Sequence, residues 1–134
     1  MVVEYAQADL RDGRLRSRTY DDIYFAADGA AEVDRVFLAP AQLPARFARA
    51  RTFTIAELGF GTGLSFLVAA TRFLANGPET ARLRFISFEK HPLRPATARN
   101  AIVAAWPEHA DEIPAAGLSV DALETAYPPP IPGW

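Results

Sequence analysis

The stretch Phe53-Thr-Ile-Ala-Glu-Leu-Gly-Phe-Gly-Thr-Gly63 decides the fold. Its first six residues are mostly β-branched or apolar and predict a strand, which ends where the glycines begin. Residues 64–76 then carry apolar side chains at helical spacing and end at Asn76-Gly77-Pro78, which predicts a helix. The order is therefore strand, glycine turn and helix.

The same order repeats on the C-terminal side of this unit. Residues 82–89, Arg-Leu-Arg-Phe-Ile-Ser-Phe-Glu, predict a second strand, and residues 96–106 predict a second helix. Strands that alternate with helices pair in parallel through right-handed crossovers. We therefore expect 53–58 and 83–89 to lie side by side in a parallel sheet.

The alternation stops after the second helix. Residues 119–125 predict a further short helix, and Tyr127-Pro-Pro-Pro-Ile-Pro-Gly-Trp134 holds too much proline for a central strand. A doubly wound sheet has roughly five to seven strands. Residues 52–134 thus predict an incomplete Rossmann-like domain, about the first half of one.

Residues 1–51 predict an N-terminal extension of two β-hairpins and a short helix. The first hairpin turns at Asp12-Gly13, since both residues tolerate positive φ. The second is expected from strand-like runs at 23–25 and 33–38, and the short helix from the spacing in 42–49. The expected fold class is α/β, with N-terminal hairpins followed by the first half of a Rossmann-like sheet.

Three arginines, Arg14, Arg16 and Arg18, alternate in the second strand of the first hairpin and share one face of it. This face is either a surface for an anionic partner or the solvated side of an edge strand.

Composition excludes several classes of protein. The 134 residues include no cysteine and two histidines, so disulfides, cysteine zinc sites and thiol nucleophiles are not expected. No run approaches the roughly 18 apolar residues of a membrane span, and the N-terminus does not resemble a signal peptide. The single lysine, Lys90, does not follow a glycine loop, which excludes a Walker A motif. We expect a cytoplasmic protein with no membrane segment and no metal site.

The strongest chemical signal is the set of glycines at 59, 61 and 63. Glycine lets the backbone approach a ligand where a Cβ would collide, and the helix behind the turn presents free N–H groups. The dinucleotide fingerprint needs Gly or Ala at position 64, which is Leu64 here. Nicotinamide and flavin cofactors, and a dinucleotide-dependent oxidoreductase, are therefore disfavoured.

Two acids indicate a different cofactor. Glu57, two residues before Gly59, repels a pyrophosphate and attracts an ammonium group, and Glu89 ends the next strand, where a carboxylate accepts both ribose hydroxyls. S-adenosylmethionine has an ammonium, a sulfonium and a ribose, and it is the expected cofactor. The alternative is that both acids are solvated strand ends and that the glycines only form a tight turn.

Five segments carry a family resemblance. They are Ser17-Arg-Thr-Tyr-Asp-Asp-Ile-Tyr-Phe25, Glu32 through Val36-Phe37-Leu38, Leu58-Gly-Phe-Gly-Thr-Gly-Leu-Ser-Phe66, Ile86-Ser-Phe-Glu-Lys-His-Pro-Leu93 and Trp106-Pro-Glu108. In these segments the sequence resembles the methyltransferase domain of the bacterial MnmC proteins and its stand-alone relatives. The resemblance implies a tRNA methyltransferase that uses S-adenosylmethionine to methylate 5-aminomethyl-2-thiouridine at the wobble position.

The resemblance also implies partners and site residues. The partner is the tRNA anticodon loop, and many relatives carry a fused flavin-dependent oxidase domain. Tyr24 and Phe25 resemble residues near the cofactor end of the pocket, where they cover the cofactor, stack on the base or pack in the strand core. Lys90 either touches the cofactor or a phosphate, or is a solvated residue at the strand end.

One family motif, Asp-Gly-Phe-Ala-Pro, has no counterpart in this sequence. Its aspartate lies beside the methyl donor in the family, so no catalytic residue is assigned, and we expect the chain to stop within the domain. Such a chain is expected to be inactive alone and to self-associate through an exposed sheet edge. The alternative is a non-catalytic half-domain remnant that acts as a binding or interaction module.

Overall fold

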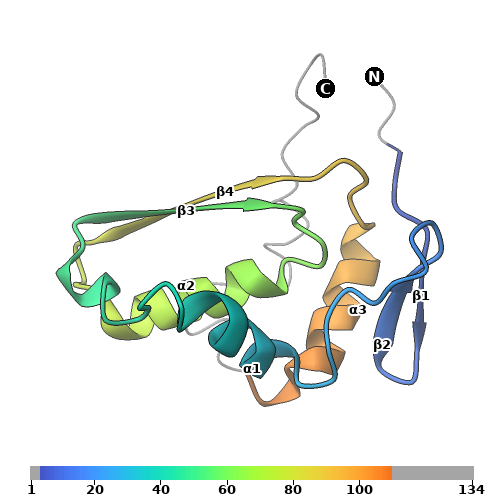
Figure 1. Ribbon diagram of the computed structural model, residues 1–134, viewed down its shortest axis with the longest axis horizontal. Helices are drawn as coiled ribbons and strands as arrows, with labels where there is room; N and C mark the ends of the chain where they lie inside the picture. Colours follow the sequence, from blue (N-terminus) through green and yellow to red (C-terminus); the bar gives the residue numbers. More distant parts are fainter. Residues whose placement is uncertain (1–3, 110–134) are drawn as a thin grey trace.

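The computed structural model describes residues 4–109, and Figure 1 shows their arrangement. The strands and α-helices are, in chain order, β1 (Ala8–Arg11), β2 (Arg14–Ser17), α1 (Gly29–Val33), β3 (Thr52–Leu58), α2 (Leu64–Asn76), β4 (Arg82–Phe88) and α3 (Pro95–Ala105). A π-helical turn, Asp34–Leu38, and two 3-10 turns, Phe47–Arg49 and Pro107–His109, complete the regular structure of this part of the chain.

The expected parallel pair is confirmed. Strands β3 and β4 pair in parallel, with a register that runs from Thr52 opposite Arg82 to Leu58 opposite Phe88. Helix α2 makes the crossover between them and lies along one face of the sheet (Figure 1). Phe53 and Ile55 pack toward the core on that face, while Thr54 between them is exposed. The strict alternation in β3 thus follows from a sheet that is covered on one side.

The first hairpin is also confirmed. Strands β1 and β2 pair antiparallel, with Arg11 opposite Arg14 at the turn. Asp12 and Gly13 both have positive φ, 51° and 72°, as a two-residue turn of this kind requires.

The second predicted hairpin is wrong. Ile23 forms only an isolated bridge to Arg16, and the expected strand over 33–38 is helical, because α1 continues into the π-helical turn Asp34–Leu38. The helical course buries Ala30, Val33 and Leu38 together on one side, where α1 packs against α2. Burial against α2 outweighs the strand propensity of this segment.

The short helix expected over 42–49 is reduced to hydrogen-bonded turns that end in the 3-10 turn Phe47–Arg49. Phe47 is fully buried and meets Phe53 and Phe73 edge-on, with ring centroids 4.9 and 5.2 Å apart. The helix expected at 119–125 and the proline-rich segment 127–134 lie outside the described residues.

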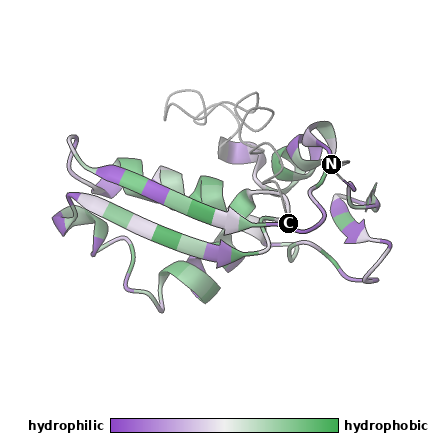
Figure 2. Cartoon of the chain, turned by 90° about the horizontal axis from the view of Figure 1, so that it is seen from above, coloured by the Kyte–Doolittle hydropathy of each residue, from purple (hydrophilic) through white to green (hydrophobic). Residues whose placement is uncertain are grey.

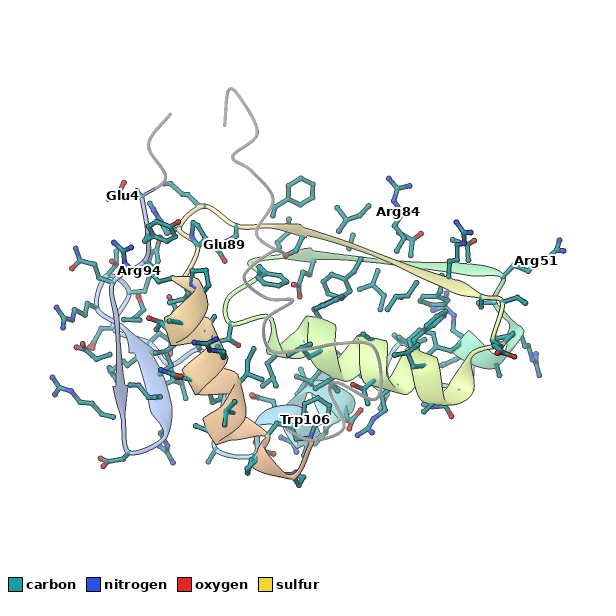
Figure 3. All side chains as sticks on the ribbon, turned by 180° about the vertical axis from the view of Figure 1, so that it is seen from behind. Glu4, Arg51, Arg84, Glu89, Arg94 and Trp106 are labelled. Atoms are coloured by element: carbon teal, nitrogen blue, oxygen red, sulfur yellow. The ribbon has the colours of Figure 1, made fainter. Side chains whose placement is uncertain are left out.

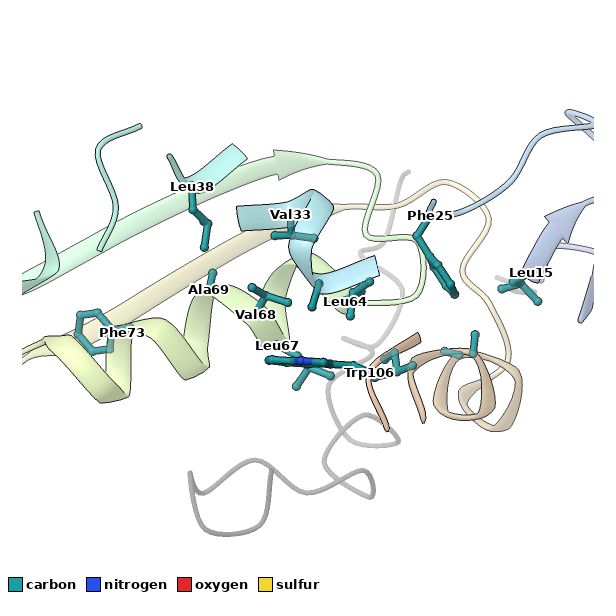
Figure 4. Close-up of a cluster of buried hydrophobic side chains, with 14 of the residues drawn as sticks. Leu15, Phe25, Val33, Leu38, Leu64, Leu67, Val68, Ala69, Phe73 and Trp106 are labelled. Atoms are coloured by element: carbon teal, nitrogen blue, oxygen red, sulfur yellow. The ribbon is translucent and has the colours of Figure 1, made fainter. Parts of the chain in front are cut away.

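One hydrophobic core joins the N-terminal segments to the β-α-β unit (Figure 4). Its larger buried members include Leu15, Phe25, Val33, Leu38, Phe47, Leu64, Leu67, Val68, Phe73, Leu93, Ile102 and Trp106. The chain before β1 is held against the loop that follows β4, since the N–H of Ala6 donates to the carbonyl of Pro92 at 2.9 Å. This contact brings the hairpin close to the carboxyl end of the sheet.

The other face of the sheet is not covered by any helix within residues 4–109 (Figure 2). Leu58 and Phe88, which end the two strands, are 89% and 46% exposed. None of the helices in the described part of the chain has the length and apolar character needed to cross a lipid bilayer.

Candidate functional site

The glycine turn connects the end of β3 to the start of α2. Gly59, Gly61 and Gly63 have φ values of 89°, 56° and 84°, a region that other residues enter only with strain. A Cβ at Gly59 would meet no atom within 4 Å, and a Cβ at Gly61 would meet only the Tyr24 ring, at 3.5 Å. The backbone of the turn is therefore bare at Gly59 and covered by a single aromatic ring at Gly61.

Glu89 follows β4 directly, and its carboxylate is fixed against this turn. One oxygen accepts the N–H of Gly61 at 3.0 Å, and the other accepts the N–H of His91 at 3.0 Å. The N–H of Gly59 also donates to the carbonyl of Phe88, at 2.7 Å. Each oxygen of the carboxylate keeps a lone pair for a further donor. The side chain is exposed beside the loop that leads into α3 (Figure 3).

An open pocket of about 500 Å³ lies over the turn. Its walls come from three segments: the chain around the hairpin, the end of β3 with its glycines, and the loop after β4. It is lined by Ala6, Ser17, Thr19, Tyr20, Asp22, Ile23, Tyr24, Leu58, Gly59, Gly61, Glu89 and His91. Of the residues predicted to bind the cofactor, the structure brings together Tyr24, Gly59, Gly61 and Glu89 in this glycine-turn pocket.

Tyr24 lines the pocket with its ring against Gly61 of the turn. Its N–H donates to the carbonyl of Leu15 at 3.0 Å, which fixes the backbone beside the hairpin. Burial raises the pKa of the Tyr24 phenol, and the negative charge of Glu89 adds to the shift. The phenol therefore stays protonated at neutral pH. Phe25 points instead into the core, with 8% of its surface exposed, so core packing accounts for it.

Glu57 is not among the residues that line this pocket. It is half-buried on the side of β3 that carries Phe53 and Ile55. Within residues 4–109, its Oε1 and the Oγ of its register partner Ser87 are buried without a hydrogen bond. Burial raises the pKa of the Glu57 carboxyl, and the charge of Glu89 adds to this.

Two other predicted residues also lie apart from the pocket lining. Lys90 is exposed, and Gly63 is buried at the start of α2. Gly63 serves the turn itself, because its N–H donates to the carbonyl of Phe60 at 2.9 Å and its carbonyl accepts the N–H of Leu67 at 3.0 Å.

Sequence reasoning did not assign Ser17, Thr19, Tyr20 or His91 to the site. Tyr20 is 67% exposed at the pocket, and its N–H donates to Ser17 Oγ at 3.2 Å. The available signal was the resemblance segment 17–25, which was interpreted only at its aromatic end. His91 lies two residues after Glu89. Its position at the site follows from the hydrogen bond that its N–H donates to the Glu89 carboxylate, which the sequence does not show.

The groups that line the pocket fit a nucleoside ligand. The backbone at Gly59 is open, so a ligand can approach it closely. The Glu89 carboxylate is held in place by Gly61 and can accept hydrogen bonds from ribose hydroxyls. The Tyr24 ring supplies a flat apolar wall. The buried, unpaired Oε1 of Glu57 is a further acceptor close in sequence to the turn.

Fold and site together define an α/β protein with part of a Rossmann-like sheet and a glycine turn at the carboxyl end of its first strand. Comparison with known proteins then gives the family. No family model matches the chain. Three curated relatives each carry the name tRNA 5-methylaminomethyl-2-thiouridine biosynthesis bifunctional protein MnmC.

The protein from Burkholderia multivorans is 43% identical over 123 residues, which is 91% of this chain and 18% of the relative. The protein from Pseudomonas fluorescens is 47% identical over 109 residues, 78% of this chain and 16% of the relative. The protein from Aeromonas salmonicida is 44% identical over 138 aligned residues, 98% of this chain and 20% of the relative.

This chain is therefore a homologue of the MnmC proteins, which are bifunctional proteins of tRNA modification, and it is related to one part of them. It spans at most about a fifth of the length of the relatives it matches.

Proposed function

We propose that this chain holds S-adenosylmethionine in the glycine-turn pocket, as the cofactor-binding part of an enzyme that methylates 5-aminomethyl-2-thiouridine at the tRNA wobble position. The observation that carries the proposal is the placement of the Glu89 carboxylate against Gly61 N–H, beside a bare Gly59. The name shared by the relatives supports the tRNA substrate.

Each residue of the pocket has a role in this proposal. Glu89 accepts hydrogen bonds from the ribose hydroxyls, and Gly59 admits the ligand close to the backbone. Gly61 holds the Glu89 carboxylate through its N–H, and the Tyr24 ring over Gly61 forms a flat wall beside the ligand. When bound, S-adenosylmethionine supplies a methyl group activated by a sulfonium. The chain's contribution is to bind, orient and shield this group from water.

The roles of Glu57 toward the methionine end and of Lys90 stay predictions. Glu57 is the better supported of the two, because a cationic group that reached its Oε1 would pair a buried oxygen that has no hydrogen bond within residues 4–109. Lys90 is exposed, and its role rests on the family resemblance alone.

The partners follow from the same proposal. The target base must leave the anticodon loop to reach a pocket, where an exposed ring such as Tyr20 offers a stacking surface. A fused flavin-dependent oxidase domain would account for the word bifunctional in the relatives' name. Among residues 4–109, β3 and β4 pair only with each other, and the edges and uncovered face of this sheet would mediate self-association. A protein that modifies tRNA would work in the cytoplasm.

Ligand-observed NMR on the purified chain tests the cofactor, since it detects millimolar affinities. We expect S-adenosylmethionine and S-adenosylhomocysteine to bind competitively and NAD to bind more weakly than either, because Leu64 stands where a dinucleotide fold needs Gly or Ala. Absence of binding by both sulfur compounds, or preferential binding of NAD, would contradict the proposal.

A further inference from the structure

A second groove lies on the hairpin and has a volume of about 540 Å³. It is lined by Asp9, Arg11, Arg14, Arg16, Ser17, Arg18, Asp21 and Ile23. We call it the arginine groove because four arginines line it. They outnumber the two aspartates, so the groove carries a net positive charge. Ser17 and Ile23 also line the glycine-turn pocket, so the two depressions are adjacent.

Like charges face each other across the hairpin at one end of this groove. Arg11 and Arg14 are register partners of β1 and β2, and both side chains are exposed. Like charges directly opposite in a sheet repel and destabilise it. Within residues 4–109, Arg14 makes no ion pair, and Arg11 has only a distant one with Asp9 at 3.8 Å. A bound anion would relieve the repulsion.

The other two arginines form ion pairs that are open to water. Arg16 Nε donates to Asp21 Oδ1 at 2.9 Å, and Arg18 Nε donates to Asp9 Oδ2 at 2.7 Å. Both arginine side chains are more than half exposed. Arg18 also donates through Nη2 to the other oxygen of Asp9, and Arg16 donates through Nη2 to the backbone carbonyl of Asp21. Each guanidinium group has five N–H donors, so both arginines keep donors for a phosphate while these contacts stay in place. Arginine also binds phosphate in a bidentate geometry.

We propose that the arginine groove binds backbone phosphates of an RNA strand next to the nucleotide that enters the glycine-turn pocket. This inference rests on the proposed function for the identity of that nucleotide. RNA is favoured over an acidic protein because the groove adjoins the glycine-turn pocket, whose lining fits a nucleoside. The exposed ring of Tyr20, which also lines that pocket, offers a surface on which a base can stack.

Fluorescence anisotropy with a labelled anticodon stem-loop RNA tests the groove. The variant Arg14→Ala removes an exposed charge that forms no ion pair with any carboxylate of residues 4–109. The matched control is Arg84→Ala, which also removes an exposed charge, from β4 and away from the hairpin (Figure 3). We expect Arg14→Ala to weaken binding roughly fivefold at low salt and to reduce the slope of log K against log salt by about 0.7 to 0.9. Arg84→Ala should stay within about twofold of the unmodified chain.

Equal losses in Arg14→Ala and Arg84→Ala would overturn the inference, because they would show attraction to net charge alone. Tighter binding of polyglutamate than of the RNA would also overturn it and would indicate a protein-binding surface. Titration of both variants with S-adenosylmethionine separates the two proposals. If S-adenosylmethionine fails to bind while Arg14→Ala still weakens RNA binding selectively, the RNA-binding role of the arginine groove is supported and the proposed cofactor is wrong.

Discussion

The carboxylate of Glu89 and the N–H of Gly61 stand 28 residues apart in the sequence and are joined by a hydrogen bond of 3.0 Å. The second carboxylate oxygen is held by the N–H of His91, so backbone groups orient both oxygens of the acid. Preorganisation of this kind reduces the entropy that a ligand must lose on binding.

Replacement of this acid tests its role directly. Glu89→Ala should weaken S-adenosylmethionine binding by about 1.5–3 kcal/mol, the range for a hydrogen bond to a charged group, or roughly ten- to hundredfold in Kd. Ligand-observed NMR titration measures the change. Glu79→Ala, which removes an exposed carboxylate from the loop between α2 and β4, is the control and should leave Kd unaltered. An unchanged Kd for Glu89→Ala would mean that the ribose contact is assigned to the wrong residue.

Two glycines form a matched pair for the turn. Gly59 and Gly13 have φ values of 89° and 72°, and a Cβ at either would meet no atom within 4 Å. Each change to Ala should therefore lower the free energy of unfolding by about 1 kcal/mol through backbone strain alone. Only Gly59→Ala should also reduce ligand affinity, since Gly59 lines the glycine-turn pocket and Gly13 does not. Urea denaturation and ligand titration check the two effects, and equal ligand affinity in both variants would count against the site.

The raised pKa of the buried Glu57 carboxyl predicts a pH dependence of stability. The folded state holds this proton more tightly than the unfolded state, so the free energy of unfolding should fall as pH rises from the ordinary carboxyl value of 4.5 toward the raised folded pKa. Glu57→Gln should remove this fall and make the protein more stable at pH 7. Urea denaturation at several pH values measures it. Identical pH profiles for both proteins would show that Glu57 ionises normally in the folded chain.

The aromatic cluster around Phe47 should dominate the stability of the core. Phe47→Ala removes a fully buried ring that contacts both β3 and α2 through Phe53 and Phe73, and should cost about 3–5 kcal/mol. Phe37→Ala, at a ring that is 59% exposed, should cost about 0.5 kcal/mol or less. Comparable losses for both variants in thermal unfolding would contradict this description of the core.

Sequence periodicity predicted the β3-α2-β4-α3 order because each of these elements has one covered face and a regular repeat. It failed over 33–38, where Val33 and Leu38 are both buried although they are five residues apart. The π-helical turn produces that spacing, which matches neither the strand repeat nor the ordinary helical repeat. The hydrophobic run Val36-Phe37-Leu38 therefore favoured the wrong prediction.

At the candidate site, sequence reasoning reached the residues whose place follows from strand order, such as Gly59, Gly61 and Glu89. It did not reach the wall made by Ser17 and Tyr20, because that wall depends on how the hairpin folds back over the turn. A long-range hydrogen bond from the N–H of Ala6 to the carbonyl of Pro92 ties the chain before the hairpin to the loop after β4. Contacts of this kind leave no trace in local spacing.

The bond from Gly59 N–H to the carbonyl of Phe88 has a consequence for motion. Because the glycine turn is hydrogen-bonded to the last residue of β4, separation of β4 from β3 would also free the glycine backbone that lines the pocket. Amide hydrogen exchange at Gly59 should therefore proceed with the opening free energy of the β3-β4 pair, as one cooperative unit. A ligand that binds only the closed form would slow exchange along both strands, far from any atom it touches.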